Sequence, residues 1–127
     1  MTLPRPPRTT IEKALAVSWP ALLVLTPKNA TVYIGAARIL SSANDDSLRN
    51  GTEAIALATQ ANDLTSGTDP SVLDTLGAAY AEAGQFPQAL DSARRALGLA
   101  VAKGDNSMAN AIRYRISLYE QSKPFRN

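Results

Sequence analysis

Apolar residues recur every three or four positions along most of this chain, and the pattern is most regular between residues 69 and 103. This spacing places the apolar side chains on one helix face, so we predict two helices, over residues 71–83 and 86–103. Asp69 is suited to cap the first helix, and Gly84 to take the left-handed conformation that ends it. The two helices therefore form a hairpin. Its apolar positions are Val72, Leu73, Leu76, Ala79, Tyr80 and Ala83, then Ala89, Leu90, Ala93, Ala96, Leu97 and Ala100.

Small residues stand where the two helices of this hairpin would touch, so their axes can come close together. The positions with a characteristic spacing are Leu76, Gly77, Tyr80, Gly84, Phe86, Ala89 and Ala96. On these positions, residues 70–103 resemble the tetratricopeptide repeat (TPR), a helix–turn–helix unit of about 34 residues. Leu73 stands where that family prefers tryptophan, and Val101 where a proline usually ends the repeat. Val101 indicates that this helix runs on and that the array is close to its end.

A second helical hairpin is predicted before the first one. Residues 31–43 and 52–64 both have helical periodicity, and a polar loop, 44–51, separates them. Ala54 lies 35 residues before Ala89, which is close to one repeat length. Residues 31–65 therefore resemble a degenerate TPR that has a longer loop and lacks the Leu-Gly pair.

A last helix is predicted over residues 105–122. Met108, Ile112, Ile116 and Tyr119 recur on one face of it, and a lysine-proline pair follows. Repeat arrays need a terminal helix that covers the apolar side of the last repeat. The expected fold is therefore all-α: a short right-handed α-solenoid of antiparallel helical hairpins with a C-terminal capping helix.

The beginning of the chain is harder to interpret. Residues 1–10 are proline-rich and basic, and we expect a flexible arm. Residues 11–25 are strongly apolar, but they contain Pro20 and are shorter than the roughly 20 residues that a membrane span needs. We favour either a helix buried in the same domain, which would then cover residues 11–127, or a surface covered by a neighbouring chain. A removed secretion signal is the alternative.

The amino-acid composition limits the kinds of catalytic and metal site that this chain can form. The chain has no cysteine and no histidine, so it lacks disulfides, thiolate nucleophiles, and the commonest general base and metal ligand. Glycine-rich phosphate loops and nucleophile motifs do not occur. Asp45 and Asp46 would suit one or two calcium ligands, but a turn is the simpler interpretation. We predict no enzyme: no catalytic residues, no metal and no cofactor.

The net charge of +2 is unevenly distributed along the chain. Residues 44–93 hold eight acidic residues and one basic residue, Arg49, whereas both ends are basic. An acidic middle attracts basic partners. Solvated helix faces are the alternative explanation of this charge pattern, and we favour that explanation. Four arginines near Tyr114 would suit nucleic acid, but the acidic block opposes phosphate, so no nucleic acid is expected. These arginines are Arg94, Arg95, Arg113 and Arg115.

The resemblance implies a function, because the first helix of each TPR hairpin lines a concave groove that holds a protein or peptide. On residues 70–103 the groove positions would be Ser71, Asp74, Ala78, Ala81 and Glu82. The two acids suit a basic segment. The alternative is a structural fragment that self-associates through residues 14–25 as a homodimer. The final ten residues are similar to the ends of bacterial TPR proteins, which suggests a natural C-terminus. We expect a cytoplasmic location.

Overall fold

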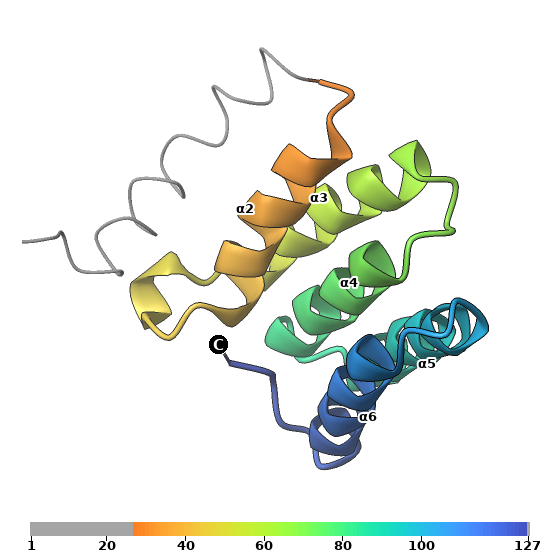
Figure 1. The fold of residues 1–127 in the computed structure, drawn as a ribbon. Helices are drawn as coiled ribbons and strands as arrows, with labels where there is room; N and C mark the ends of the chain where they lie inside the picture. Colours follow the sequence, from red (N-terminus) through yellow and green to blue (C-terminus); the bar gives the residue numbers. More distant parts are fainter. Residues whose placement is uncertain (1–26, 127) are drawn as a thin grey trace, which may run out of the picture.

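The structure is a computed structural model, and it describes residues 27–126. All regular secondary structure in this range is helical, which confirms the all-α prediction (Figure 1). The elements are α2 (Ala30–Ser42), the short 3₁₀ helix η1 (Asp46–Leu48), α3 (Gly51–Leu64), α4 (Pro70–Glu82), α5 (Phe86–Ala102) and α6 (Asn106–Glu120). The five predicted helices begin and end within two residues of these bounds. The predicted arm, 1–10, and the apolar segment, 11–25, lie outside the described residues.

Local hydrogen bonds explain these boundaries. The side chains of Asn29, Asn50, Asp69 and Asp105 accept hydrogen bonds from backbone N–H groups in the first turns of α2, α3, α4 and α6. Such caps satisfy donors that have no partner inside the helix. At the end of α4, Gly84 has a φ of +78°, and the N–H after it donates to the Tyr80 carbonyl oxygen at 2.8 Å. This is the predicted left-handed ending.

The loop predicted over residues 44–51 contains one element that the pattern does not indicate, the 3₁₀ turn η1. The Asp45 side chain accepts a hydrogen bond from the backbone N–H of Ser47 at 3.0 Å, and this bond caps the turn. Leu48 is buried at the end of the turn. An aspartate cap and one buried leucine are enough to form a single helical turn here.

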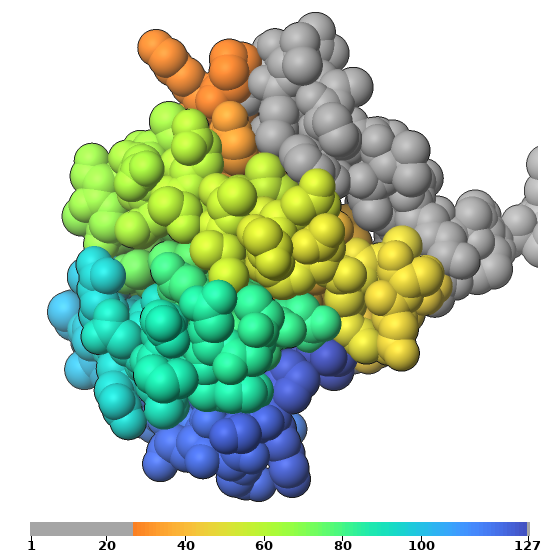
Figure 2. All heavy atoms as spheres, turned by 180° about the vertical axis from the view of Figure 1, so that it is seen from behind, coloured from red at the N-terminus to blue at the C-terminus, as the bar shows by residue number. Residues whose placement is uncertain are grey.

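The helices pack as successive hairpins. α2 packs on α3, and α4 packs on α5, while α2 and α3 both contact α4, and α6 packs on α5. In Figure 1, α2, α4 and α6 lie toward the viewer. Seen from behind in Figure 2, α3 and α5 form much of the opposite face. The first helix of each hairpin therefore shares one side of the molecule with α6.

Alanines form the contacts between the second helix of each hairpin and its neighbours. Two sets of alanines, offset from each other by 35 residues, are completely buried: Ala54, Ala58 and Ala61 in α3, and Ala89, Ala93 and Ala96 in α5. Gly77 allows the closest contact between α4 and α5, because a Cβ atom there would lie 3.2 Å from the Ala89 carbonyl oxygen. Leu73, at the position where tryptophan was expected, is also completely buried. Helix axes come close wherever these small residues meet.

The last helix packs on α5 and contributes apolar side chains to the core. Ile112 and Tyr119 are buried, and Met108 and Ile116 pack against the core from α6. α6 thus covers the side of α5 that would otherwise meet water. Among residues 27–126, no helix has both the length and the apolar character that crossing a membrane requires.

Candidate functional site

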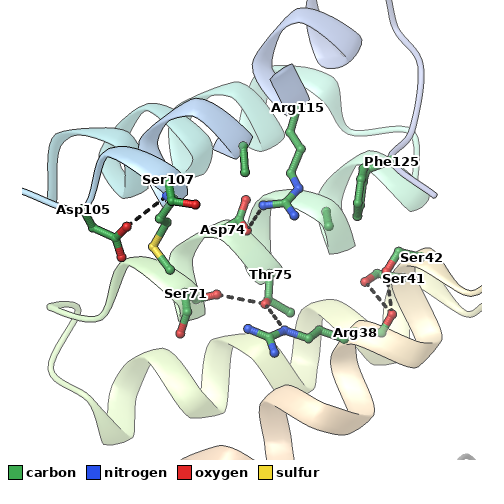
Figure 3. Close-up of a pocket in the computed structure, with 13 residues that line it drawn as sticks. Arg38, Ser41, Ser42, Ser71, Asp74, Thr75, Asp105, Ser107, Arg115 and Phe125 are labelled. Carbon is green, nitrogen blue, oxygen red and sulfur yellow. Dashed lines mark hydrogen bonds and ion pairs between the residues drawn. The ribbon is translucent and has the colours of Figure 1, made fainter. Parts of the chain in front are cut away.

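An open pocket of about 530 Å³ lies where α2, α4, α6 and the segment after α6 come together (Figure 3). The residues that line it are Arg38, Ser41 and Ser42 from α2, Ser71, Asp74, Thr75 and Ala78 from α4, Asp105, Ser107, Met108, Ala111 and Arg115 around α6, and Phe125. Hydroxyl, charged and apolar groups alternate around its wall. It holds two arginines and two aspartates, so its formal charges balance.

The floor of the pocket is a hydrogen-bonded bridge between α2 and α4. The Arg38 Nε donates to the Thr75 Oγ1 at 3.3 Å, and the Thr75 hydroxyl donates to the Ser71 carbonyl oxygen at 2.9 Å. The Ser42 hydroxyl donates to the Arg38 carbonyl oxygen at 2.8 Å. The first of these bonds holds Arg38 against α4, and the other two lie within α4 and α2, as Figure 3 shows.

A partly buried ion pair closes the side of the pocket next to α6. The Arg115 Nη1 donates to the Asp74 Oδ2, and the two side chains are 22% and 14% exposed. Burial raises the pKa of Asp74 above its ordinary value of 3.8, although the charges of Arg115 and Arg38 oppose this shift. The guanidinium carbon of Arg115 also lies 4.5 Å from the centre of the Phe125 ring, within reach of a cation–π contact.

A second partly buried carboxylate, Glu82, lies at the end of α4. Glu82 is 15% exposed and forms ion pairs with two arginines: the Arg49 Nε at 3.2 Å and the Arg126 Nη1 at 2.7 Å. Arg49 also donates to the carbonyl oxygens of Ala43, at 2.7 Å, and Asn44, at 3.3 Å. Glu82 thus connects the loop after α2 to the segment after α6.

The predicted groove residues are brought together only in part. Ser71, Asp74 and Ala78 line the pocket, whereas Glu82 lies beyond its lining and contacts Arg126. Ala81 needs a correction: it is 2% exposed and belongs to the core, because the face of α4 that meets the neighbouring helices is wider than the periodicity indicated. The preference for a solvated acidic face is also wrong for Asp74 and Glu82, since arginines of the same chain hold both carboxylates in buried pairs.

Sequence reasoning missed most of the other lining residues. Arg38, Met108 and Phe125 come from three separate parts of the chain, and no local pattern connects them. Phe125 alone gave a signal, because a large apolar side chain in the polar segment that follows the last helix is unusual. Arg115 was one of the four arginines considered as a basic surface near Tyr114. Tyr114 is exposed, but the Arg115 side chain binds Asp74 instead of lying on that surface.

The effect of a Tyr119 substitution on the free energy of unfolding tests whether the side chains around Asp74 are buried. The Tyr119 side chain is 1% exposed, and its hydroxyl has no hydrogen-bond partner among the described residues. Burial first, and then the Asp74 charge, raise the pKa of Tyr119 above its ordinary range. Because an unsatisfied buried hydroxyl costs free energy, we expect Tyr119→Phe to raise the free energy of unfolding by up to about 1 kcal/mol in urea denaturation.

Tyr33→Phe is the matched control for that substitution. The Tyr33 hydroxyl donates to the Pro27 carbonyl oxygen at 3.0 Å, so its removal is expected to lower the free energy of unfolding by about 1 kcal/mol. A loss of stability for Tyr119→Phe as large as that of the control would contradict the assignment of an unsatisfied hydroxyl.

Within residues 27–126, no three histidine, cysteine, aspartate or glutamate side chains come together in a way that could hold a metal ion. Comparisons with models of protein families, with curated proteins and with solved structures found no match. The pocket is therefore interpreted from its own chemistry.

Proposed function

We propose that this chain is a non-catalytic, TPR-like interaction module that holds an extended segment of a protein partner in the pocket between α2, α4 and α6. The observation that carries the proposal is the position of this pocket, which is lined by the first helix of both hairpins and by α6. The two sets of buried alanines in α3 and α5, offset by 35 residues, support the interpretation of the hairpins as successive repeats.

The chemistry of the pocket favours a polypeptide ligand. A main chain offers N–H and C=O groups at regular intervals. The pocket offers hydroxyls, a carboxylate and Arg38, which is held against α4, and these groups can form hydrogen bonds with a main chain. Met108, Ala78 and Ala111 supply apolar surface for side chains between these polar points. The pocket is open to solvent, which suits access by a segment of another chain.

The acids of α4 favour a partner with a basic group. Asp74 and Glu82 each hold at least one arginine of the chain itself, so both already bind the kind of group that a basic segment would bring. Reversing their charges would leave buried arginines without partners, and such variants would lose stability as well as binding. A test of binding must therefore change lining residues that hold no other part of the fold.

Ala111 is the best position for that test, because it lines the pocket from α6 and is only partly exposed. We expect Ala111→Trp to fill the pocket and weaken ligand binding at least tenfold, a loss of about 1.4 kcal/mol. Ser117 is exposed on the same helix and does not line the pocket, so Ser117→Trp is the matched control.

The ligand for this test comes from selection of phage-displayed peptides on the immobilised chain. The affinities of the selected peptides for the wild type and both tryptophan variants are then measured by fluorescence anisotropy. The proposal predicts that Ala111→Trp weakens binding and that Ser117→Trp does not. Peptides that bind all three chains equally, or a selection that yields no binding peptide, would refute it.

A further inference from the structure

The segment that follows α6, residues 123–126, folds back on the pocket and is called the tail below. The Lys123 N–H donates to the Leu118 carbonyl oxygen at 2.9 Å, and this bond turns the chain back at the end of α6. From there the tail has no regular secondary structure and runs toward the loop after α2 in Figure 1. Pro124 has a fixed φ and disfavours helical backbone at Lys123, the residue before it.

Two side chains of the tail make contacts that a bound ligand would make. Phe125 forms one wall of the pocket, packs against the core and lies under the guanidinium of Arg115 (Figure 3). Arg126 places its Nη1 2.7 Å from the Glu82 Oε2. An aromatic ring in a pocket and a cation on a buried carboxylate are typical anchors of a bound peptide.

The Glu82 carboxylate binds its two arginines in different ways. Arg49 is also held by two backbone carbonyl groups and by Asp46, so it belongs to the framework of the fold. Arg126 reaches Glu82 from the tail and also donates to the Phe125 carbonyl oxygen at 3.0 Å. Removing the tail's arginine from Glu82 therefore requires no helix to unfold, and Arg49 still balances the carboxylate.

From these contacts we infer that the edge of the pocket at Phe125, together with Glu82 beyond the pocket's lining, is a binding site for an extended partner segment in which an arginine follows an aromatic residue. In the free chain, the tail occupies this site. A partner segment of the same chemistry displaces the tail. Such a partner must therefore bind the site tightly enough to compete with the tail. This inference rests on the proposed function, because it names the ligand chemistry of the same pocket.

A tethered segment competes at an effective concentration in the millimolar range, so it weakens the binding of a free peptide of similar affinity by a large factor.

The probe is a fluorescein-labelled synthetic peptide with the sequence of residues 121–127, and its binding is measured by fluorescence anisotropy. The receptors are the full wild-type chain and the double variant Phe125→Ala/Arg126→Ala. The matched control is Lys123→Ala, which removes an exposed charge from the same tail.

We expect the double variant to bind the peptide at least about tenfold more tightly than the wild type, and Lys123→Ala to bind like the wild type. A second peptide, with alanine and glutamate at the positions of Phe125 and Arg126, should not bind. The inference is overturned if the double variant binds no peptide, if all three chains bind it equally, or if the second peptide binds as well as the first.

If the double variant does not fold, a measurement on the wild-type sequence still tests the inference. The chain has two phenylalanines, Phe86 and Phe125, so 4-fluorophenylalanine gives two ¹⁹F signals. Excess peptide should shift the Phe125 signal toward that of an exposed ring and leave the Phe86 signal unchanged, and an unchanged Phe125 signal would refute displacement. A Phe125 signal that depends on protein concentration would show that a second copy supplies the tail, and would overturn its occupancy within one chain.

The same signals distinguish this inference from the proposed function. Selected peptides that depend on Ala111 but lack the aromatic-arginine pair, and that leave the Phe125 signal unchanged, would refute the inference and leave the proposed function standing. Failure of both the selected peptides and the tail peptide would refute the two together.

Discussion

Gly51→Ala is expected to lower the free energy of unfolding by about 2–3 kcal/mol, because an added methyl group has no space at the start of α3. A Cβ atom on Gly51 would lie 2.7 Å from the backbone nitrogen and 2.9 Å from the Cα of Ala83. Backbone atoms cannot rotate away as a side-chain end can. The first turn of α3 would have to move from the end of α4, next to Glu82. Urea denaturation followed by circular dichroism at 222 nm measures the loss.

Gly98→Ala is the matched control, with the opposite expected sign. Gly98 lies within α5, is exposed, and has no atom within 4 Å of the position where a Cβ would be placed. Alanine is the better helix former by about 1 kcal/mol, so this substitution should stabilise the chain. Equal effects of the two substitutions would contradict the close contact between α3 and α4.

Arg115→Met is expected to lower the free energy of unfolding by about 3 kcal/mol at pH 7, because it leaves the Asp74 carboxylate buried without its main partner. Methionine keeps much of the apolar stem that packs in the pocket, so the loss reports mainly on charge. Asp74→Asn should cost less, since the amide oxygen still accepts a hydrogen bond and the more exposed arginine keeps its contact with Phe125.

The pH dependence of this loss has a defined sign. In the folded wild type, burial raises the pKa of Asp74 above 3.8, so the folded state holds this proton more tightly than the unfolded state. The ionised carboxyl then lowers stability as the pH rises from 3.8 through the folded pKa. Removing Arg115 raises that pKa further. The deficit of Arg115→Met should therefore be full at pH 7 and shrink toward pH 4, as urea denaturation at both pH values measures.

A deficit that is the same at both pH values would contradict this explanation, because lost packing does not depend on the protonation of a carboxyl group. Asp74→Asn/Arg115→Met is the companion variant. Since it removes the buried charge together with its partner, it should be more stable than Arg115→Met alone at pH 7.

The helices could be predicted from the sequence because the features that define them are local. Asp69 caps α4 two residues from the N–H that it binds, and Gly84 ends the same helix with its positive φ. The alanines of α5 recur at helical spacing and are completely buried as that spacing indicates. Each of these signals lies within a few residues of the structure that it determines.

The pocket could not be predicted in the same way, because the pairs that form it are distant in sequence. Asp74 and Arg115 are 41 residues apart, and Arg38 and Thr75 are 37 residues apart. A charged residue on a helical pattern is usually exposed, so periodicity placed Asp74 on a solvated face. Gly51 belonged to the predicted loop, 44–51, and only its distance to Ala83 shows that it is a contact between two helices.

We propose that the pocket between α2, α4 and α6 receives the partner. The decisive measurement is a titration of the ¹⁵N-labelled wild-type chain with a selected peptide, followed by ¹H–¹⁵N correlation spectra. We expect saturable shifts for Arg38, Thr75, Ala111 and the tail, with little change on the outer faces of α3 and α5. Shifts concentrated on α3 and α5, with the residues of the pocket unchanged, would contradict it.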